Sequence, residues 1–242
     1  MRINLRYQIV LFSDFTKVQD DTKTRETFLE CWKSYDFRLK PLIEASLGPA
    51  GISNQSRPSF STADGSFSVN IHSDQVVMEA LNTDINVFKM PSMAEFMDRV
   101  FDICSKSNLL SSQRYKRVGM IRQVFYKDID INRAYKRFCN GIKFYDNLEM
   151  NDWSIFFPAH KVIANSRIIN ATSRIDHVKT MVKMDSMNKP FDGIASITDV
   201  NTLATNRVDN ISWEEMQMII KDLQKIEYEI TNQTADAIEE DK

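Results

Sequence analysis

The chain has 242 residues, with 31 Lys and Arg against 33 Asp and Glu, so its formal net charge is −2. Hydrophobic residues make up 43% of the sequence, as in ordinary soluble globular proteins. Only six Gly and six Pro are present. This composition argues against a collagen-like or disordered chain and against a Gly-rich phosphate-binding loop.

The cysteines and the N-terminal segment indicate a reduced, cytoplasmic setting. Cys31, Cys104 and Cys139 are far apart and form no CxxC pair, so no disulfide framework or zinc knuckle is expected. The opening MRINLRYQIVLF is interrupted by Arg6 and Gln8 and does not read as a signal peptide. No segment approaches the roughly 18 apolar residues of a membrane helix, so we expect no membrane partner.

The first elements in chain order are a strand, a helix and a loop. Residues 3–12 are rich in β-forming side chains and predict a strand. After DDTKT, a helical spacing extends as far as Pro41, which should end or kink the helix. The side chains that share this helix face are Phe28, Trp32, Tyr35 and Leu39. Residues 47–58 contain two Gly and two Pro and predict a loop.

A hairpin, a capped helix and a long strand follow. Residues 66–72 alternate between apolar and polar side chains, and a turn and a second strand come next. Ser92 and Glu95 have the spacing of a capping box, which predicts a helix over 93–106. Residues 114–127 are apolar on both faces at their centre. They predict a central strand that is covered on both sides.

The second half of the chain is less regular. Asp130 is placed to cap a short helix over 131–140. Residues 160–184 fit either two strands of a hairpin or a helix, and this choice stays open. Residues 194–206 predict a strand. A second capping box then precedes a long helix with a regular apolar stripe, formed by Met216, Ile219, Ile220, Leu223, Ile226 and Ile230.

These elements predict an α+β fold, with an antiparallel sheet and helices packed on one side. The order strand, helix, strand, strand, helix, strand is that of a ferredoxin-like split βαβ unit. Ser212 and Glu215 repeat the spacing of Ser92 and Glu95. Coincidence would explain this repeat, because capping boxes are common, and so would two tandem units. We therefore expect one unit over 1–128, a second over 129–232, and an acidic flexible tail over 233–242.

Three segments carry a resemblance to a known family. They are DGSFSVNIHSDQVVMEA, MAEFMDRVFDI and RVGMIRQVFY, and the end of the chain, ASITDVNTLATNRVDNISWEEMQMIIKDLQKIEYEIT, continues it. The layout over 60–127 and 194–232 resembles a family of uncharacterised, sporadically distributed prokaryotic proteins of about this length. This chain departs from the family in having less Gly and Pro and no His in the closing helix. The resemblance implies an α+β fold and no particular activity, and sporadic distribution suits an accessory role such as defence against phage or mobile elements.

Motifs of common enzymes are absent from the sequence. It contains no GxGxxG, GxxxxGK[ST], GxSxG or HExxH, and its three histidines have no metal-ligand spacing. Asp128 and Asp130 could hold Mg²⁺, but a turn residue followed by a helix cap explains them better. We predict no catalytic, cofactor or metal residues. A hydrolase site built from distant residues stays an alternative.

Charge is strongly divided along the chain. Residues 113–145 hold nine basic and two acidic residues, a net charge of +7, interleaved with aromatic residues. Residues 209–242 hold three basic and ten acidic residues, a net charge of −7. The candidate anion or nucleic-acid patch comprises Arg114, Lys116, Arg117, Arg122, Arg133, Lys136 and Arg137. The basic segment would be neutralised by the acidic helix, bind a protein partner, or bind nucleic acid.

Arg122 is unusual within this set, because it shares a strand face with apolar residues. It must be either the anchor of an internal salt bridge or the floor of an anion-binding groove. The whole pattern predicts a non-enzymatic binding or adaptor protein that contacts another protein or a second copy of itself. The alternative from another class is an RNA or single-stranded nucleic-acid binding module that uses residues 113–145.

Overall fold

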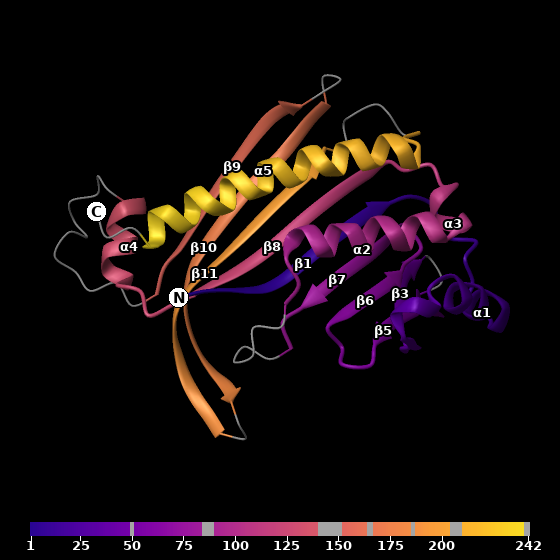
Figure 1. Ribbon diagram of the computed structural model, residues 1–242, viewed down its shortest axis with the longest axis horizontal. Helices are drawn as coiled ribbons and strands as arrows, with labels where there is room; N and C mark the ends of the chain where they lie inside the picture. The colour runs from indigo at the N-terminus through magenta and orange to yellow at the C-terminus, as the bar shows by residue number, and fades with distance from the viewer. Residues whose placement is uncertain are drawn as a thin grey trace.

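The fold is α+β and is built on one large antiparallel sheet (Figure 1). The computed structural model describes residues 1–48, 51–83, 90–139, 152–163, 167–184, 187–203 and 210–239. Nine strands pair in the order β2-β5-β6-β7-β1-β8-β11-β10-β9. They are β1 (Arg2–Phe12), β2 (Phe37–Leu39), β5 (Ser59–Thr62), β6 (Phe67–Ile71), β7 (Gln75–Leu81), β8 (Arg117–Lys127), β9 (Ser154–Ile163), β10 (Arg167–Met184) and β11 (Met187–Thr202). A separate two-stranded sheet pairs β3 (Ile43–Gly48) with β4 (Gly51–Ser56).

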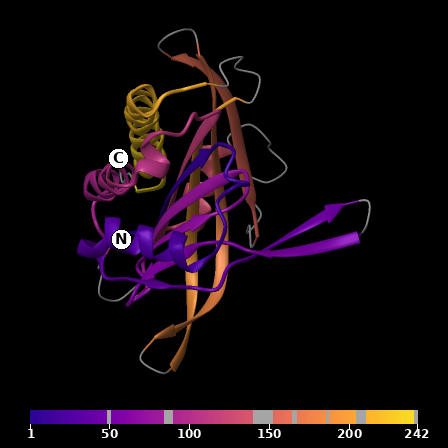
Figure 2. The ribbon, with the colours of Figure 1, turned by 90° about the vertical axis from the view of Figure 1, so that its right-hand side faces the viewer.

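Helices pack on one face of the large sheet, as the sequence predicts. They are α1 (Thr22–Cys31), α2 (Met93–Lys106), the short α3 (Asn108–Ser111), α4 (Ile131–Phe138) and α5 (Trp213–Glu239), with one turn of 3₁₀-helix at Lys33–Tyr35. In Figures 1 and 2, α2 and α5 run along the same side of the sheet. The predicted apolar stripe of α5 is buried there, apart from the half-buried Ile230. No helix among the described residues is long and apolar enough to cross a membrane.

The strand order is symmetric about the central pair β1 and β8. Outward from this pair, one side runs β1-β7-β6-β5 and continues to the extra edge strand β2, and the other side runs β8-β11-β10-β9. In each half the central strand comes first, a short helix (α1 or α4) follows, and three consecutive strands lead into a long helix (α2 or α5). Ser92 and Ser212 therefore stand before equivalent helices. In this arrangement β8 is the counterpart of β1, whereas the expected division after residue 128 groups β8 with the first half.

The best-predicted element is α2, whose observed bounds are those expected. The Ser92 side chain accepts a hydrogen bond from the Glu95 N–H at 3.2 Å, and the Glu95 carboxylate accepts one from the Ser92 N–H at 2.8 Å. The predictions of β1, of the β6–β7 hairpin, of β8 and of α4 with its Asp130 cap are also confirmed. The open choice over 160–184 is settled in favour of strands β9 and β10.

Two predictions in the first half were wrong. The first helix ends at Cys31 rather than near Pro41, because Trp32 closes it and Asp36 adopts a left-handed backbone with φ 49°. Leu39, expected on the helix face, lies on β2 and is exposed. The predicted loop at 47–58 contains most of the β3–β4 hairpin instead, with residues 49–50 outside the described part. Strand β4 has one large apolar side chain, Ile52, so hydrophobic alternation gave no signal for it. In β3 the apolar residues Ile43, Ala45 and Leu47 do alternate with polar ones, but the Gly and Pro content of 47–58 favours a loop.

Two predictions about the second half also need correction. Helix α5 continues to Glu239 with Ala235 and Ile238 buried, so most of the expected flexible tail is helix. Strand β8 is central, but helices cover only one of its faces. On the other face Phe125 is buried against Ile3 and Ala195 of the neighbouring strands. Its ring lies over Gly193, where a β-carbon would collide with it.

The predicted strand over 194–206 corresponds to β11, which begins earlier, at Met187, and ends at Thr202. Residues 204–206 lie outside the described part of the chain.

Candidate functional site

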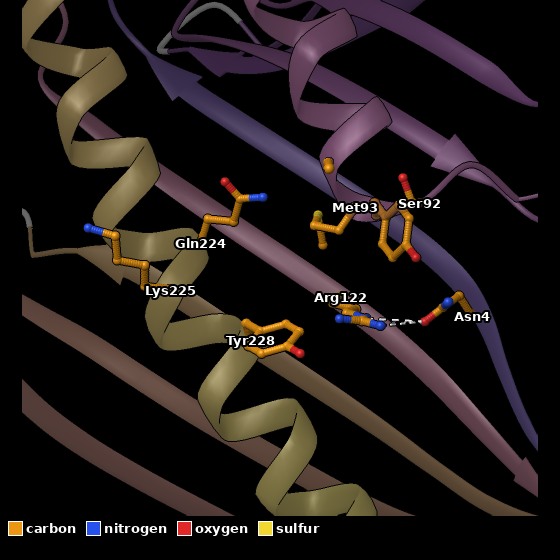
Figure 3. Close-up of a pocket in the computed structure, with 9 residues that line it drawn as sticks. Asn4, Ser92, Met93, Arg122, Gln224, Lys225 and Tyr228 are labelled. Atoms are coloured by element: carbon orange, nitrogen blue, oxygen red, sulfur yellow. Dashed lines mark hydrogen bonds between the residues drawn. The ribbon is translucent and has the colours of Figure 1, made fainter.

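A cleft lies where the two halves meet, between the start of α2 and the middle of α5, above β1 and β8 (Figure 3). Its volume is about 500 Å³, within the range of small-molecule sites. Strands β1 and β8 supply the floor, and the two helices supply the walls. The residues that line it are Asn4, Tyr7, Ser92, Met93, Ala94, Arg122, Gln224, Lys225 and Tyr228.

Arg122 forms the polar centre of the floor and is only 8% exposed. Its Nε and Nη2 donate to the Asn4 Oδ1 at 3.1 and 2.9 Å. Its Nη1 lies 3.5 Å from the Glu227 Oε1, and its guanidinium lies 5.5 Å from the centre of the Tyr7 ring. Arg122 therefore combines the two roles considered from the sequence, because it anchors an internal ion pair and also lines a groove.

Glu227 is fully buried on α5, beside Arg122. Its Oε1 also accepts a hydrogen bond from the Thr231 hydroxyl at 2.6 Å, and its Oε2 has no hydrogen-bond partner among the described residues. Burial raises the pKa of Glu227, and the neighbouring Arg122 opposes that rise. The Arg122 guanidinium is thus the main charged group that stabilises the ionised form of this buried carboxyl group.

The walls of the cleft are mostly apolar. Met93 is half-buried, whereas Tyr228 is 63% exposed at the rim. Burial raises the pKa of Tyr7 in the floor although Arg122 acts to lower it, so the Tyr7 hydroxyl stays protonated at neutral pH. An apolar enclosure around a few convergent polar groups is typical of a binding site.

The remaining predicted site residues do not gather around this cleft. Arg114 and Lys116 lie before the start of β8, and Arg133 and Lys136 lie on α4 beyond its end. An 11-residue strand is roughly 33 Å long, so these pairs lie near opposite ends of that strand. Arg117 lies on the face of β8 opposite Arg122 and stacks on Phe12, 4.6 Å from its ring centre.

The acidic helix packs beside the basic segment. Helix α5 contacts both β8 and α4. Besides the Arg122–Glu227 pair, the Arg137 Nη1 donates to the Ala237 carbonyl near the end of α5 at 3.0 Å. Part of the +7 segment is therefore engaged by the −7 segment, as one of the three sequence interpretations expects.

Other polar groups outside the cleft have structural roles. Asp130 accepts the Arg133 N–H as a helix cap, and Asp128 lies in a turn with φ 59°. His177 pairs with Asp192 at 2.7 Å, while its sequence neighbour Asp176 pairs with Arg174. The described residues contain no group of three or more His, Cys, Asp or Glu placed to hold a metal ion.

Sequence reasoning identified Arg122 but missed Asn4, Tyr7 and Glu227. One signal for Glu227 was available. It lies four residues after Leu223 and seven after Ile220, so it interrupts the apolar stripe of α5 with a charge. A charged residue in that position needs a buried partner.

A scan against models of known protein families finds no match, and no curated protein is similar to this chain. The family resemblance described above therefore stays a prediction.

Proposed function

We propose that this chain is a non-enzymatic binding or adaptor protein that acts through protein contacts on the face of the sheet opposite the helices. We call this surface the open face. The observation that carries the proposal is that no described helix covers it (Figure 2), although large apolar side chains lie exposed on it. The exposed side chains on its strands are Leu81, Phe156, Val162 and Ile168.

The charges of the open face favour a protein partner over nucleic acid. Arg6 pairs with Glu79, and Arg174 pairs with Asp176 at 2.9 Å. Arg117 is engaged by the Phe12 ring and by the Thr202 carbonyl, to which its Nε donates at 3.0 Å. Nucleic-acid binding relies on cations that are available to neutralise phosphates. A surface on which these three cations are engaged and apolar groups are exposed suits a protein surface of similar polarity.

The occupant that we propose is a second copy of this chain, paired through the open face. Nine strands spaced about 4.8 Å apart, with about nine residues each on average, present a face of roughly 1,300 Å². This exceeds the roughly 800 Å² that each partner contributes to a standard protein interface, so part of the face is large enough for one. A two-fold axis would bring the same mixed surface of each copy together, as in most homodimers.

The test is the mass of the protein in solution, measured by light scattering after size exclusion from about 1 to 200 µM. We expect the wild type to form a dimer. Phe156→Arg and Ile168→Arg should each yield monomers, because each places a charge in the apolar part of the interface. The matched control is Met218→Arg, which changes an exposed side chain on α5 and should leave the dimer intact. A wild type that is monomeric at 200 µM overturns self-pairing.

The nucleic-acid alternative is tested in parallel by fluorescence anisotropy, with labelled 20-nucleotide RNA and single-stranded DNA at 50 and 200 mM salt. The proposal expects no binding that depends on α4. Tight binding at low salt that disappears in the Arg133→Glu, Arg137→Glu double variant would instead favour the RNA or single-strand module.

The wider setting and the finer architecture are also proposals. The family resemblance supports a cytoplasmic component of a prokaryotic accessory system, for example defence against phage or mobile elements. The three free cysteines are compatible with a reducing compartment. The adjacent order β6-β7-β1-β8 supports a ferredoxin-like first unit, and the matching order β10-β11-β8-β1 supports a second tandem unit that shares the two central strands.

A further inference from the structure

We infer that the cleft between α2 and α5 binds a small organic monocarboxylate with an apolar body. The inference is independent of the open face and of self-pairing, because the cleft lies on the helix-covered side of the sheet. It rests on the donors of Arg122, on the charge balance around that residue, and on the apolar walls.

Arg122 has donor capacity beyond its internal contacts. A guanidinium carries five N–H donors, and the contacts with Asn4 and Glu227 use three of them. The contact with Glu227 is long, at 3.5 Å. Because Arg122 is a lining residue of the cleft, its small exposed surface is accessible to a ligand there. A carboxylate is the partner that two N–H donors of one guanidinium match best.

The charge balance favours a single negative charge on the ligand. Glu227 already offsets much of the charge of Arg122. Lys225 at the rim adds one cation, but it is highly exposed and lies 3.4 Å from Asp222. The first turn of α2 at Met93 and Ala94 also lines the cleft, but the Glu95 carboxylate of the capping box offsets the partial positive charge of that helix start. This environment matches a monoanion better than a phosphate dianion, which needs more than one uncompensated cation.

The walls define the remainder of the ligand. Figure 3 shows Met93 and Tyr228 projecting toward the space above Arg122 from the two helices. With the buried Tyr7 ring in the floor, they make a surface suited to an aromatic or branched aliphatic group. The ligand would place its carboxylate on Arg122 and its apolar body between the two helices.

The test compares phenylacetate with phenylacetamide, which has the same shape and no charge, by saturation-transfer NMR and calorimetry at pH 7. We expect phenylacetate to bind and phenylacetamide to bind at least about 10-fold more weakly, because the charge-assisted hydrogen bond is lost. Phenyl phosphate should also bind more weakly than phenylacetate. Equal binding of the acid and the amide would overturn the inference.

Two pairs of variants locate the site without disturbing the Arg122–Glu227 pair. Met93→Trp fills the cleft and should abolish phenylacetate binding, whereas Met218→Trp, on an exposed part of α5 outside the cleft, should not change it. Lys225→Ala should weaken binding about two- to threefold, and Lys221→Ala, one turn away, should have no effect. Unchanged binding in Met93→Trp would place the ligand elsewhere and refute the assignment.

Discussion

The two halves of the sheet share one arrangement of strands and helices, but the side chains buried beneath their helices differ. In the first half, aromatic side chains pack against one another beneath α1 and α2. Trp32 stacks on Phe28 with ring centres 4.7 Å apart and meets Phe60 edge-on at 5.2 Å. In the second half, buried polar side chains replace many of these rings on the face beneath α5. They include Ser173, Ser196, Thr198 and Thr202.

One of these polar groups, Thr198, begins a connected path to the cleft. The Thr198 hydroxyl lies 3.2 Å from that of Thr231, which donates to Glu227, and Glu227 pairs with Arg122. The path thus crosses from β11 through α5 to β8. Buried polar networks stabilise less than apolar packing, and they specify geometry when they are satisfied. The comparison indicates that the first half supplies stability, while the second half and its junction with the first position the binding groups.

The largest expected effect comes from the aromatic core. Trp32→Ala should lower the free energy of unfolding by about 4 kcal/mol, because it empties a fully buried site and removes the hydrogen bond from its Nε1 to the Ile103 carbonyl. Urea unfolding followed by circular dichroism measures the change. A loss below about 1 kcal/mol would mean that the first half is not the more stabilising one.

The buried ion pair gives the next effect. Arg122→Met should cost about 3 kcal/mol in the same measurement, because it leaves the Glu227 carboxylate buried without a cation. Adding Glu227→Met should recover most of that loss. The control Arg174→Met removes an exposed pair and should cost less than about 1 kcal/mol. A double variant no more stable than Arg122→Met would refute this account of the pair.

The pH dependence of Glu227 tests the same network in another way. Its pKa is raised by burial, so its favourable contribution is complete below the unfolded-state pKa near 4.5 and is lost as pH rises through the folded-state pKa. Glu227→Gln does not titrate. Its stability relative to wild type should therefore increase from pH 4.5 to 7, whereas Glu229→Gln, on the exposed side of α5, should show no such trend. If the difference in stability between Glu227→Gln and wild type did not change with pH, the raised pKa of Glu227 would be contradicted.

The smallest effect compares the two helix starts. Ser92→Ala should cost about 1 kcal/mol, because both hydrogen bonds of its capping box are present. Ser212→Ala should cost less. The Ser212 hydroxyl accepts a hydrogen bond from the Glu215 N–H, but the Glu215 carboxylate pairs with Arg167 at 2.5 Å instead of completing the capping box. Thermal unfolding of the two variants side by side measures the difference. An equal loss for Ser212→Ala would show that matching sequence spacing produced matching caps, and it would contradict this expectation, as would a larger loss.

The sequence by itself determined the elements whose signals are local. The bounds of α2 followed from a capping box and a helical spacing, and the faces of β8 followed from alternation, because both depend on residues near one another in the chain. The same reasoning identified Arg122 as a charge that needs a partner. It also placed Asp130 at a helix start.

Only the tertiary structure decided how distant segments meet. The partner of Arg122 lies 105 residues away on α5, and Asn4 lies 118 residues away on β1. No local pattern encodes those pairings, since strand order and helix packing set them. The cleft exists because β1 and β8 are adjacent at the junction of the two halves. The positive charge of Arg122 in its floor is partly offset because α5 brings Glu227 against β8.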